Sequence, residues 1–168
     1  MIGVGDLFPN FHLTGVEKDN SIIDIDILTP NMWSVVYFYP KDFTFICPTE
    51  ISAMDKLTNN ADVIGVSGDN EYCKIAWKTS VGMIRDIKHI LAADCGLKLA
   101  SKLGIVDPDE GVCLRATYIV DPEGVIQHVS VNALDTGRNA DEILRTLQAL
   151  KAGGLTACAW QEGDDFVA

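Results

Sequence analysis

A short apolar run leads into a proline and then into a helix that begins at a cysteine, and this stretch constrains the fold more than any other. Val35–Tyr39 is β-branched and aromatic, as buried strands are. Pro40 ends that strand, and Pro48 fits the first turn of a helix, where its missing N–H costs nothing. Apolar residues at helical spacing predict that this helix runs to about Asn59–Asn60. The sequence therefore places Cys47 at a helix N-terminus, just after a strand.

A thiol in that place is disposed to ionise. A free cysteine has a pKa near ~8.5, and the N–H groups of a helix start together with a cation bring such thiols to roughly 3.5–7.5. Glu50, in the first turn of the same helix, opposes ionisation of Cys47 unless a basic residue neutralises it. We therefore expect an arginine from elsewhere in the chain. The alternative is a buried cysteine that packs as a small apolar side chain.

Composition excludes several classes of function. The chain has 168 residues, of which 48% are hydrophobic, which suffices for one sizeable core and not for two. Its net charge of −11 repels phosphate backbones, so nucleic-acid binding is not expected. No apolar run approaches the ~20 residues of a membrane span. Residues 1–6 lack the basic and apolar start of a signal peptide. We expect a soluble, cytoplasmic protein.

The cysteines argue against a secreted disulfide framework and against a metal site. There are five, an odd number, and they are widely spread: Cys47, Cys73, Cys95, Cys113 and Cys158. None forms a Cys-x-x-Cys pair, and no histidine lies at ligand spacing, so no metal is expected.

The remaining pattern predicts an α/β fold. Apolar runs predict further strands at residues 8–13 (a short edge strand), 63–67, 90–93, 116–120 and 125–131. Helical spacing and end signals predict helices at residues 71–81, 97–103 and 141–152. Residues 107–111 are expected to form a loop, and Asp121–Gly124 a hairpin turn. This order is thioredoxin-like: three layers around a central mixed β-sheet, with a domain at 1–152 and a C-terminal tail at 153–168.

The site motif resembles a known family. The spacing Pro40-x-x-x-Thr44-x-x-Cys47, continued by Pro48, resembles the peroxidatic site of the peroxiredoxins. The run 43–50 is most similar to the alkyl hydroperoxide reductase peroxidase subunit and its typical two-cysteine relatives. This resemblance implies that Cys47 is the attacking thiolate, that Thr44 orients the peroxide and that Pro40 shields the pocket from water. From the residues alone, Thr44 is equally an ordinary loop residue.

Two arginines fit the same resemblance. Residues 109–115, Asp-Glu-Gly-Val-x-x-Arg, resemble the segment that leads to the catalytic arginine of the family, which implies that role for Arg115. Arg138 matches a second arginine that pairs with the glutamate equivalent to Glu50, so both are assigned supporting roles. Without the resemblance, Arg115 reads as a charge at a strand end and Arg138 as a surface charge at a helix start.

Cys158 is the candidate resolving cysteine. It lies in a tail of small residues before Trp160, and no long segment follows that would hold this tail in place. The usual resolving cysteine of the family lies four residues before this tryptophan, where the present chain has Thr156. The other three cysteines match no family motif and are expected to be packing or spectator residues, with Cys73 or Cys113 as substitutes for resolution.

The resemblance implies a thiol peroxidase that reduces hydrogen peroxide and organic hydroperoxides to water and alcohols. It implies a sulfenic acid, an intersubunit disulfide, an external thiol or disulfide reductase as electron donor, and no cofactor. It further implies a homodimer joined along the edge strand 125–131, closing into a ring. Two alternatives stay open. A thiol–disulfide oxidoreductase would need a second cysteine close to Cys47, and a chaperone-like binding role would not need Cys47 at all.

Overall fold

The computed structural model describes residues 1–168, and the chain divides into two compact units, Met1–Arg138 and Asn139–Ala168. Compactness places this division after Arg138, and the domain boundary expected at residue 152 stays a prediction. The longest helix has 13 residues, and none is long and apolar enough to span a bilayer.

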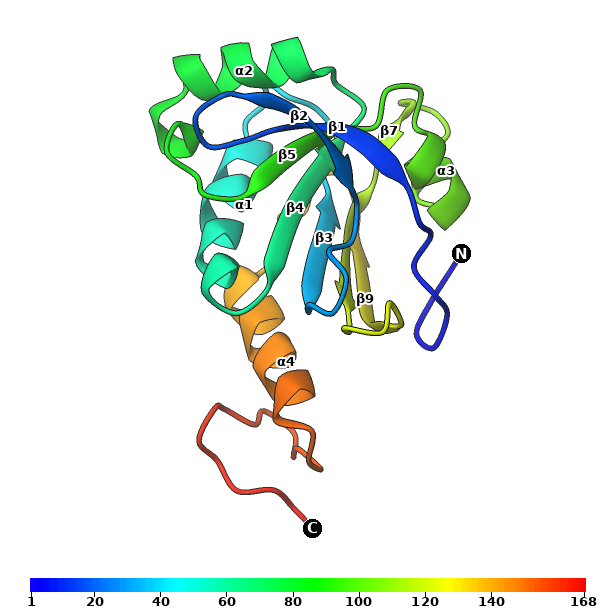
Figure 1. Ribbon diagram of the computed structural model, residues 1–168, viewed down its shortest axis with the longest axis vertical. Coiled ribbons are helices and arrows are strands. Elements are labelled where there is room, and N and C mark those ends of the chain that lie inside the picture. The colour runs from blue at the N-terminus through cyan, green and yellow to red at the C-terminus, as the bar shows by residue number, and fades with distance from the viewer. The chain divides into compact units, whose positions relative to one another are not determined.

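The first unit is built on a seven-stranded sheet with the order β2-β1-β5-β4-β3-β8-β9 (Figure 1). The strands are β1 (His12–Val16), β2 (Ile22–Asp26), β3 (Ser34–Phe38), β4 (Asp62–Ser67), β5 (Ile90–Ala93), β8 (Arg115–Val120) and β9 (Ile126–Asn132). β4 pairs in parallel with β3 and β5, whereas the other neighbours are antiparallel. The sheet is therefore mixed, as predicted.

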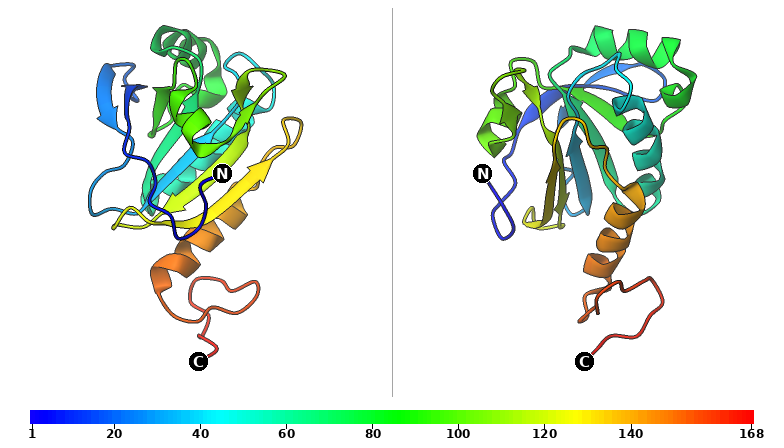
Figure 2. Two further views of the ribbon diagram at one scale, coloured as in Figure 1. Left: turned by 90° about the vertical axis from the view of Figure 1, so that its right-hand side faces the viewer. Right: turned by 180° about the vertical axis from the view of Figure 1, so that it is seen from behind.

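Helices cover both faces of this sheet. The first unit contains α1 (Cys47–Met54), η1 (Asp55–Asn59), α2 (Glu71–Ser80), η2 (Gly82–Ile84) and α3 (Lys98–Leu103). Figures 1 and 2 show α1 and α3 on opposite sides of the central strands. All five residues of β3 are buried, as expected for a strand covered on both faces. The predicted three-layer α/β fold is confirmed.

The main apolar core lies between α3 and the sheet. Its members from α3 are Leu99, Ala100 and Leu103, and its members from β3 are Val36 and Phe38. Full burial of a large apolar side chain such as Leu, Val or Phe stabilises the fold by ~1.5–3 kcal/mol relative to leaving it exposed. Burial of these alternate strand positions fixes the register of β3 and therefore the position at which the chain leaves the sheet toward Cys47.

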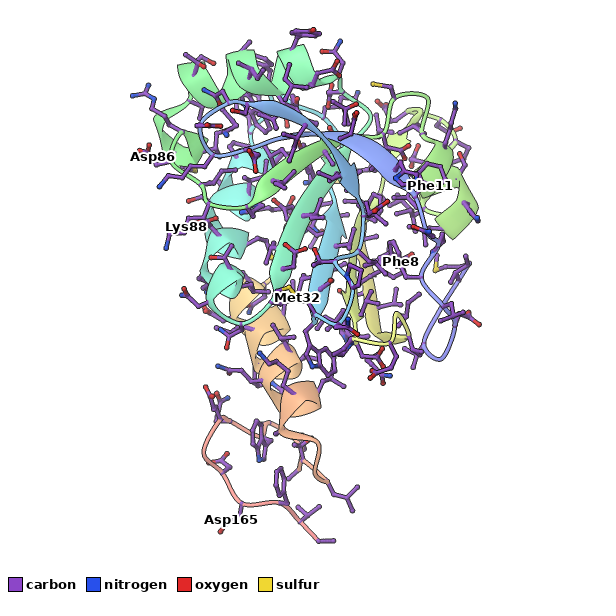
Figure 3. The ribbon with its side chains drawn as sticks, in the orientation of Figure 1. Phe8, Phe11, Met32, Asp86, Lys88 and Asp165 are labelled. Carbon is purple, nitrogen blue, oxygen red and sulfur yellow. The ribbon has the colours of Figure 1, made fainter.

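The first strand differs from its prediction. Residues 8–11 form no strand, and β1 begins at His12 and is flanked by β2 and β5, so it is not an edge strand. Pro9 has no N–H to donate to a ladder. The segment is held instead by single backbone bonds, from the Phe8 N–H to the Gly124 carbonyl and from the Ile27 N–H to the Phe11 carbonyl. Phe8 and Phe11, labelled in Figure 3, pack against the core, and the Phe8 ring meets Tyr118 edge-on at 5.5 Å.

The segment expected as a loop before Arg115 contains a small hairpin. β6 (Val106–Asp107) pairs with β7 (Val112–Cys113) in a separate two-stranded ribbon. Gly111 makes the turn possible because its φ of +62° is in the left-handed region, where side chains are strained. The sequence pattern predicts only a loop here, because β6 and β7 are each two residues long and too short to show a strand periodicity.

Local hydrogen bonds shape one turn and one helix start. Asp121 Oδ1 accepts from the N–H groups of Glu123 and Val125, and Gly124 has a φ of +84°, so the predicted hairpin turn joins β8 to β9. The carboxylate of Asp94 caps α3, where it accepts from the N–H groups of the second and third helical residues.

The second unit consists of α4 (Ala140–Ala152) and a folded tail. The tail is held at two points: Arg145 Nη1 donates to the Trp160 carbonyl over 2.9 Å, and the Trp160 and Phe166 rings stack with centroids 6.2 Å apart. The backbone of Val167 also donates to Leu155. The tail was expected to lack a long segment that would hold it in place, and short-range contacts within the second unit hold it instead. A tryptophan and a phenylalanine six residues apart are enough to close a loop within one short segment.

Candidate active site

Cys47 is the first residue of α1 and follows the carboxyl end of β3 through a loop, as predicted. Its side chain is 1% exposed. Pro48 occupies the first turn, and the N–H groups of Thr49 and Glu50 turn back to the Ile46 carbonyl. The loop thus delivers a buried sulfur to the helix start, where the partial positive charge of the helix dipole favours an anion.

Arg115 is the cation that the charge of Glu50 required. Its Nη1 lies 3.4 Å from Cys47 Sγ and donates to Glu50 Oε2 over 2.6 Å. Its Nε donates to the Leu134 carbonyl over 2.6 Å, so the guanidinium is held from both sides. Arg115 is 5% exposed and Glu50 is 3% exposed. A buried, fixed positive charge therefore touches the sulfur directly.

Arg138 holds the other side of the Glu50 carboxylate. Both its backbone N–H and its Nε donate to Glu50 Oε1 over 3.0 Å. Its Nη1 donates to the Ala116 carbonyl and to Thr117 Oγ1, each over 3.1 Å, and its Nη2 to the Phe38 carbonyl. Two guanidinium groups against one carboxylate leave one net positive charge beside Cys47. An anion at the sulfur would therefore face a positive charge.

The loop residues predicted for the site lie between β3 and Cys47. Pro40 is buried, and Thr44 is half-buried with its hydroxyl donating to the Lys41 carbonyl over 2.8 Å. Phe43, just before Thr44, has a φ of +57°, which is strained for an aromatic residue. Such a strained loop persists only where neighbouring contacts hold it in place.

Those contacts come from a buried polar cluster that sequence reasoning missed. Lys74 of α2 and Asp42 of the loop have fully buried side chains, with Nζ 3.5 Å from Oδ1. Lys74 Nζ also donates to Ser67 Oγ over 2.6 Å and to the Tyr39 hydroxyl over 2.9 Å, and that hydroxyl donates to Asp42. Burial raises the pKa of Asp42, and Lys74 opposes that rise. The sequence contains only a weak signal of this cluster, namely that Lys74 lies three residues before the buried Trp77.

A second missed cluster lies behind Arg138. The Arg138 guanidinium lies over the Tyr37 ring, 5.0 Å from its centroid. The Tyr37 hydroxyl is 2.7 Å from His89 Nε2, and His89 Nδ1 is 2.7 Å from Asp55 Oδ1. Burial lowers the pKa of His89. Partial burial raises the pKa of Asp55, but the hydrogen bonds from His89 and Lys88 outweigh it and leave the pKa lowered. The pair therefore consists of a neutral His89 imidazole and an ionised Asp55 carboxylate.

The four other cysteines differ in accessibility. Cys158 is exposed in the second unit, and Cys95 is exposed after β5. Cys113 is fully buried in β7, and burial raises its pKa to about 12, which makes it unsuited to act as a substitute thiol. Cys73 is half-buried in α2, and burial followed by Asp42 and Asp69 raises its pKa.

Comparison with known proteins agrees with this geometry. Residues 4–129 match the model of the AhpC/TSA family. The chain is 37% identical to alkyl hydroperoxide reductase C of Mycolicibacterium smegmatis, with 99% of this chain and 94% of the relative covered. It is 39% identical to the protein of the same name from Mycobacterium tuberculosis, with 98% and 92% covered.

Solved structures extend the agreement to the whole fold. The reduced 2-Cys peroxiredoxin of Plasmodium vivax superposes with a TM-score of 0.90 at 35% identity, covering 98% of this chain and 92% of that one. AhpC of Mycobacterium tuberculosis superposes with a TM-score of 0.82 at 36% identity, covering 90% and 99%. The chain therefore belongs to the AhpC/TSA family and is a peroxiredoxin.

Proposed function

We propose that Cys47 is the attacking thiolate of this thiol-dependent peroxidase. The sulfur attacks the O–O bond of hydrogen peroxide or an organic hydroperoxide. The distal oxygen stays on the sulfur as sulfenic acid, and the other oxygen takes a proton and leaves as water or alcohol. The observation that carries this proposal is the contact between Arg115 Nη1 and Cys47 Sγ at 3.4 Å.

Arg115 has two tasks in this scheme. It stabilises the thiolate before attack, and its remaining donors stabilise negative charge on the leaving oxygen. Glu50 and Arg138 act through Arg115 and are positioning residues, since they fix its guanidinium. Thr44 orients the peroxide with its hydroxyl, and buried Pro40 keeps water from the sulfur. No metal, haem or flavin is required for these steps.

Resolution is assigned to Cys158 of a partner subunit. Its thiol condenses with the Cys47 sulfenic acid, forming a disulfide and releasing water. An external thiol or disulfide reductase then supplies two electrons and two protons to restore both thiols. Support comes from the exposure of Cys158 and from the relatives named 2-Cys peroxiredoxins. Thr156 at the usual resolving position makes this the assignment most in need of a test. Because the cycle draws on cellular thiol reductants, we also propose a cytoplasmic location.

Assembly follows from the sheet edge. β9 is the last strand of the sheet. Gly5 and Asp6 bond to its first residue, Ile126, and the edge beyond Ile126 is available to pair with a second copy. We propose a homodimer joined along β9 that closes into a ring. Light scattering of the reduced and the oxidised protein tests it, and a stable monomer in both states would contradict it.

The central experiment measures peroxide consumption by wild type and by Cys47→Ser with a thiol reductant. We expect loss of turnover in the variant, whereas Cys95→Ser, a matched change at an exposed cysteine, keeps the wild-type rate. Peptide mapping after one equivalent of peroxide should find Cys47 joined to Cys158. Near-normal turnover in Cys47→Ser would refute Cys47 as the attacking thiolate. Absence of turnover in the wild type would instead leave the two alternatives, a disulfide exchange enzyme and a chaperone-like binding protein.

A further inference from the structure

Three side chains with metal-ligand atoms gather beside the loop that carries Cys47. Asp42 comes from that loop, Asp69 from the turn after β4, and Cys73 from the first turn of α2. One oxygen of each carboxylate and the Cys73 sulfur all lie within 4.8 Å of one another. These residues have no place in the peroxidase scheme described above.

One atom of this group lacks a partner. The Asp42 side chain is fully buried, yet its Oδ2 makes no hydrogen bond. A buried carboxylate oxygen left unpaired destabilises the folded state unless something compensates it. The Cys73 sulfur is a neighbour of this carboxylate and lies within 4.8 Å of one of its oxygens. A cation that replaced the thiol proton would satisfy both groups.

The surroundings resemble an outer coordination shell. Asp42 Oδ1 accepts from the Tyr39 hydroxyl over 2.8 Å, and Asp69 Oδ2 accepts from Ser67 Oγ over 2.7 Å and from the Asp42 N–H over 2.9 Å. Each carboxylate is thus oriented through one oxygen. Metal-ligating carboxylates are commonly fixed in this way.

The charge balance suits a divalent ion. Two carboxylates and a thiolate carry three negative charges, and the Lys74 ammonium, 3.5 Å from Asp42 Oδ1, supplies one positive charge. A divalent ion brings this sum to zero. A thiolate among the ligands selects zinc-type ions over magnesium and calcium, which prefer all-oxygen sites.

We propose that Asp42, Asp69 and Cys73 form a binding site for a thiophilic divalent cation of the Zn²⁺ type. Water would complete a tetrahedral set. Tetrahedral zinc places oxygen and sulfur ligands about 3.4–3.6 Å apart, so the side chains need to close by about 1 Å. Binding exchanges the thiol proton for the metal: Cys73–SH and M²⁺ give a Cys73–S–M bond and H⁺, which buffer takes up. Asp69 lines a pocket of about 420 Å³ with Pro40 and Lys41, which gives the ion a route in.

The bound ion would link the Cys47 loop to α2. This consequence, unlike the site itself, rests on the proposed function: Cys47 has to leave its buried position to reach Cys158 of a partner. A metal bridge from Asp42 to Cys73 opposes that opening. Zn²⁺ should therefore slow disulfide formation in the wild type.

The test of the site uses full-length Cys47→Ser/Cys158→Ser protein, so that neither reactive thiol competes for metal. Titration with Cd²⁺ should produce the ultraviolet charge-transfer band of a cadmium–thiolate bond, and Zn²⁺ affinity follows from competition with a chelator. Adding Cys73→Ala should abolish the band and weaken Zn²⁺ binding by more than about 100-fold. Ser67→Ala, an outer-shell change, should weaken it by roughly 10–100-fold. The matched control Cys95→Ala should change neither, and circular dichroism verifies folding of each variant.

Retention of the band and of the affinity in Cys73→Ala would overturn the site. The link to the loop has its own test: Zn²⁺ should inhibit peroxide turnover in the wild type and not in Cys73→Ala. Binding without inhibition would overturn the link alone. Failure of the proposed function appears separately, as turnover that survives Cys47→Ser while metal binding is unaffected.

Discussion

The Arg115 guanidinium touches the Cys47 sulfur, Nη1 to Sγ 3.4 Å, across 68 positions of the chain. The sheet brings them together, because β8 begins at Arg115 and pairs antiparallel with β3, the strand that leads to Cys47. The same nitrogen donates to Glu50. The position of the guanidinium is therefore fixed by strand register, by the Glu50 carboxylate and by the Leu134 carbonyl, and not by the loop that holds the thiol.

Arg115→Ala should lower the rate of peroxide attack by about 10²–10³-fold, the cost of removing one donor that stabilises developing charge. Arg115→Lys should recover only part of this rate, since lysine lacks the Nε donor with which Arg115 is held at the Leu134 carbonyl. Stopped-flow measurement of Cys47 oxidation checks both. Equal rates in wild type and Arg115→Ala would contradict the role given to this contact.

Glu50→Gln should destabilise the fold as well as the site. The carboxylate is buried and receives charge-assisted donors from Arg115 and Arg138. Its loss leaves two buried guanidinium groups without a counterion, which costs roughly 3–5 kcal/mol of unfolding free energy. Urea unfolding measures this. The control is Glu110→Gln, which removes an exposed ion pair with Lys41 and should cost less than ~1 kcal/mol.

Local signals in the sequence located Cys47 and the need for a cation at Glu50, because helix starts and unbalanced charges are visible within a few residues. The partner itself, Arg115, was identified through the family resemblance. The pairing of Asp42 with Lys74 had no such signal: the two are 32 positions apart, and a lysine in an amphipathic helix is ordinarily exposed. Contacts of this kind follow from how α2 lies on the sheet, which a one-dimensional pattern does not encode.

Lys74→Met should therefore lower the unfolding free energy more than the same change at a surface lysine. It leaves the Asp42 carboxylate buried without its cation, for a loss of roughly 3–5 kcal/mol. Adding Asp42→Asn should restore part of this loss, since the uncompensated charge is gone. A double-mutant cycle by urea unfolding measures the coupling, and Lys102→Met on exposed α3 surface is the control. Additive effects would show that the pair is not coupled.

Stability should fall on mild acidification because of His89. Burial lowers its pKa in the folded state below the unfolded value of about 6.5. The unfolded chain therefore binds the proton first, so this stabilisation is complete above about pH 6.5 and is lost as pH falls toward the folded pKa. His89→Gln should reduce the pH dependence of the unfolding free energy between about pH 7 and 5. His12→Gln, at an exposed histidine, should leave that dependence unchanged. A wild-type slope in His89→Gln would contradict this.

The folded tail should limit how fast Cys158 resolves the sulfenic acid. Trp160 stacks on Phe166 within the segment that carries Cys158. Releasing this stack by Phe166→Ala removes about 0.5–1.5 kcal/mol, which should speed disulfide formation by about two- to tenfold if the tail has to open. Less sulfenic acid would then wait for a second peroxide, so less sulfinic acid should form at Cys47.

Gly154→Ala provides an independent route to the same release, because a Cβ there would lie 2.5 Å from the Phe166 ring. Val167→Ala, an exposed neighbour, is the control. Rapid-quench trapping with mass spectrometry measures both products across rising peroxide. If both tail variants form the disulfide at the wild-type rate, tail opening does not limit resolution, and the displaced position of Cys158 relative to Thr156 becomes the remaining constraint.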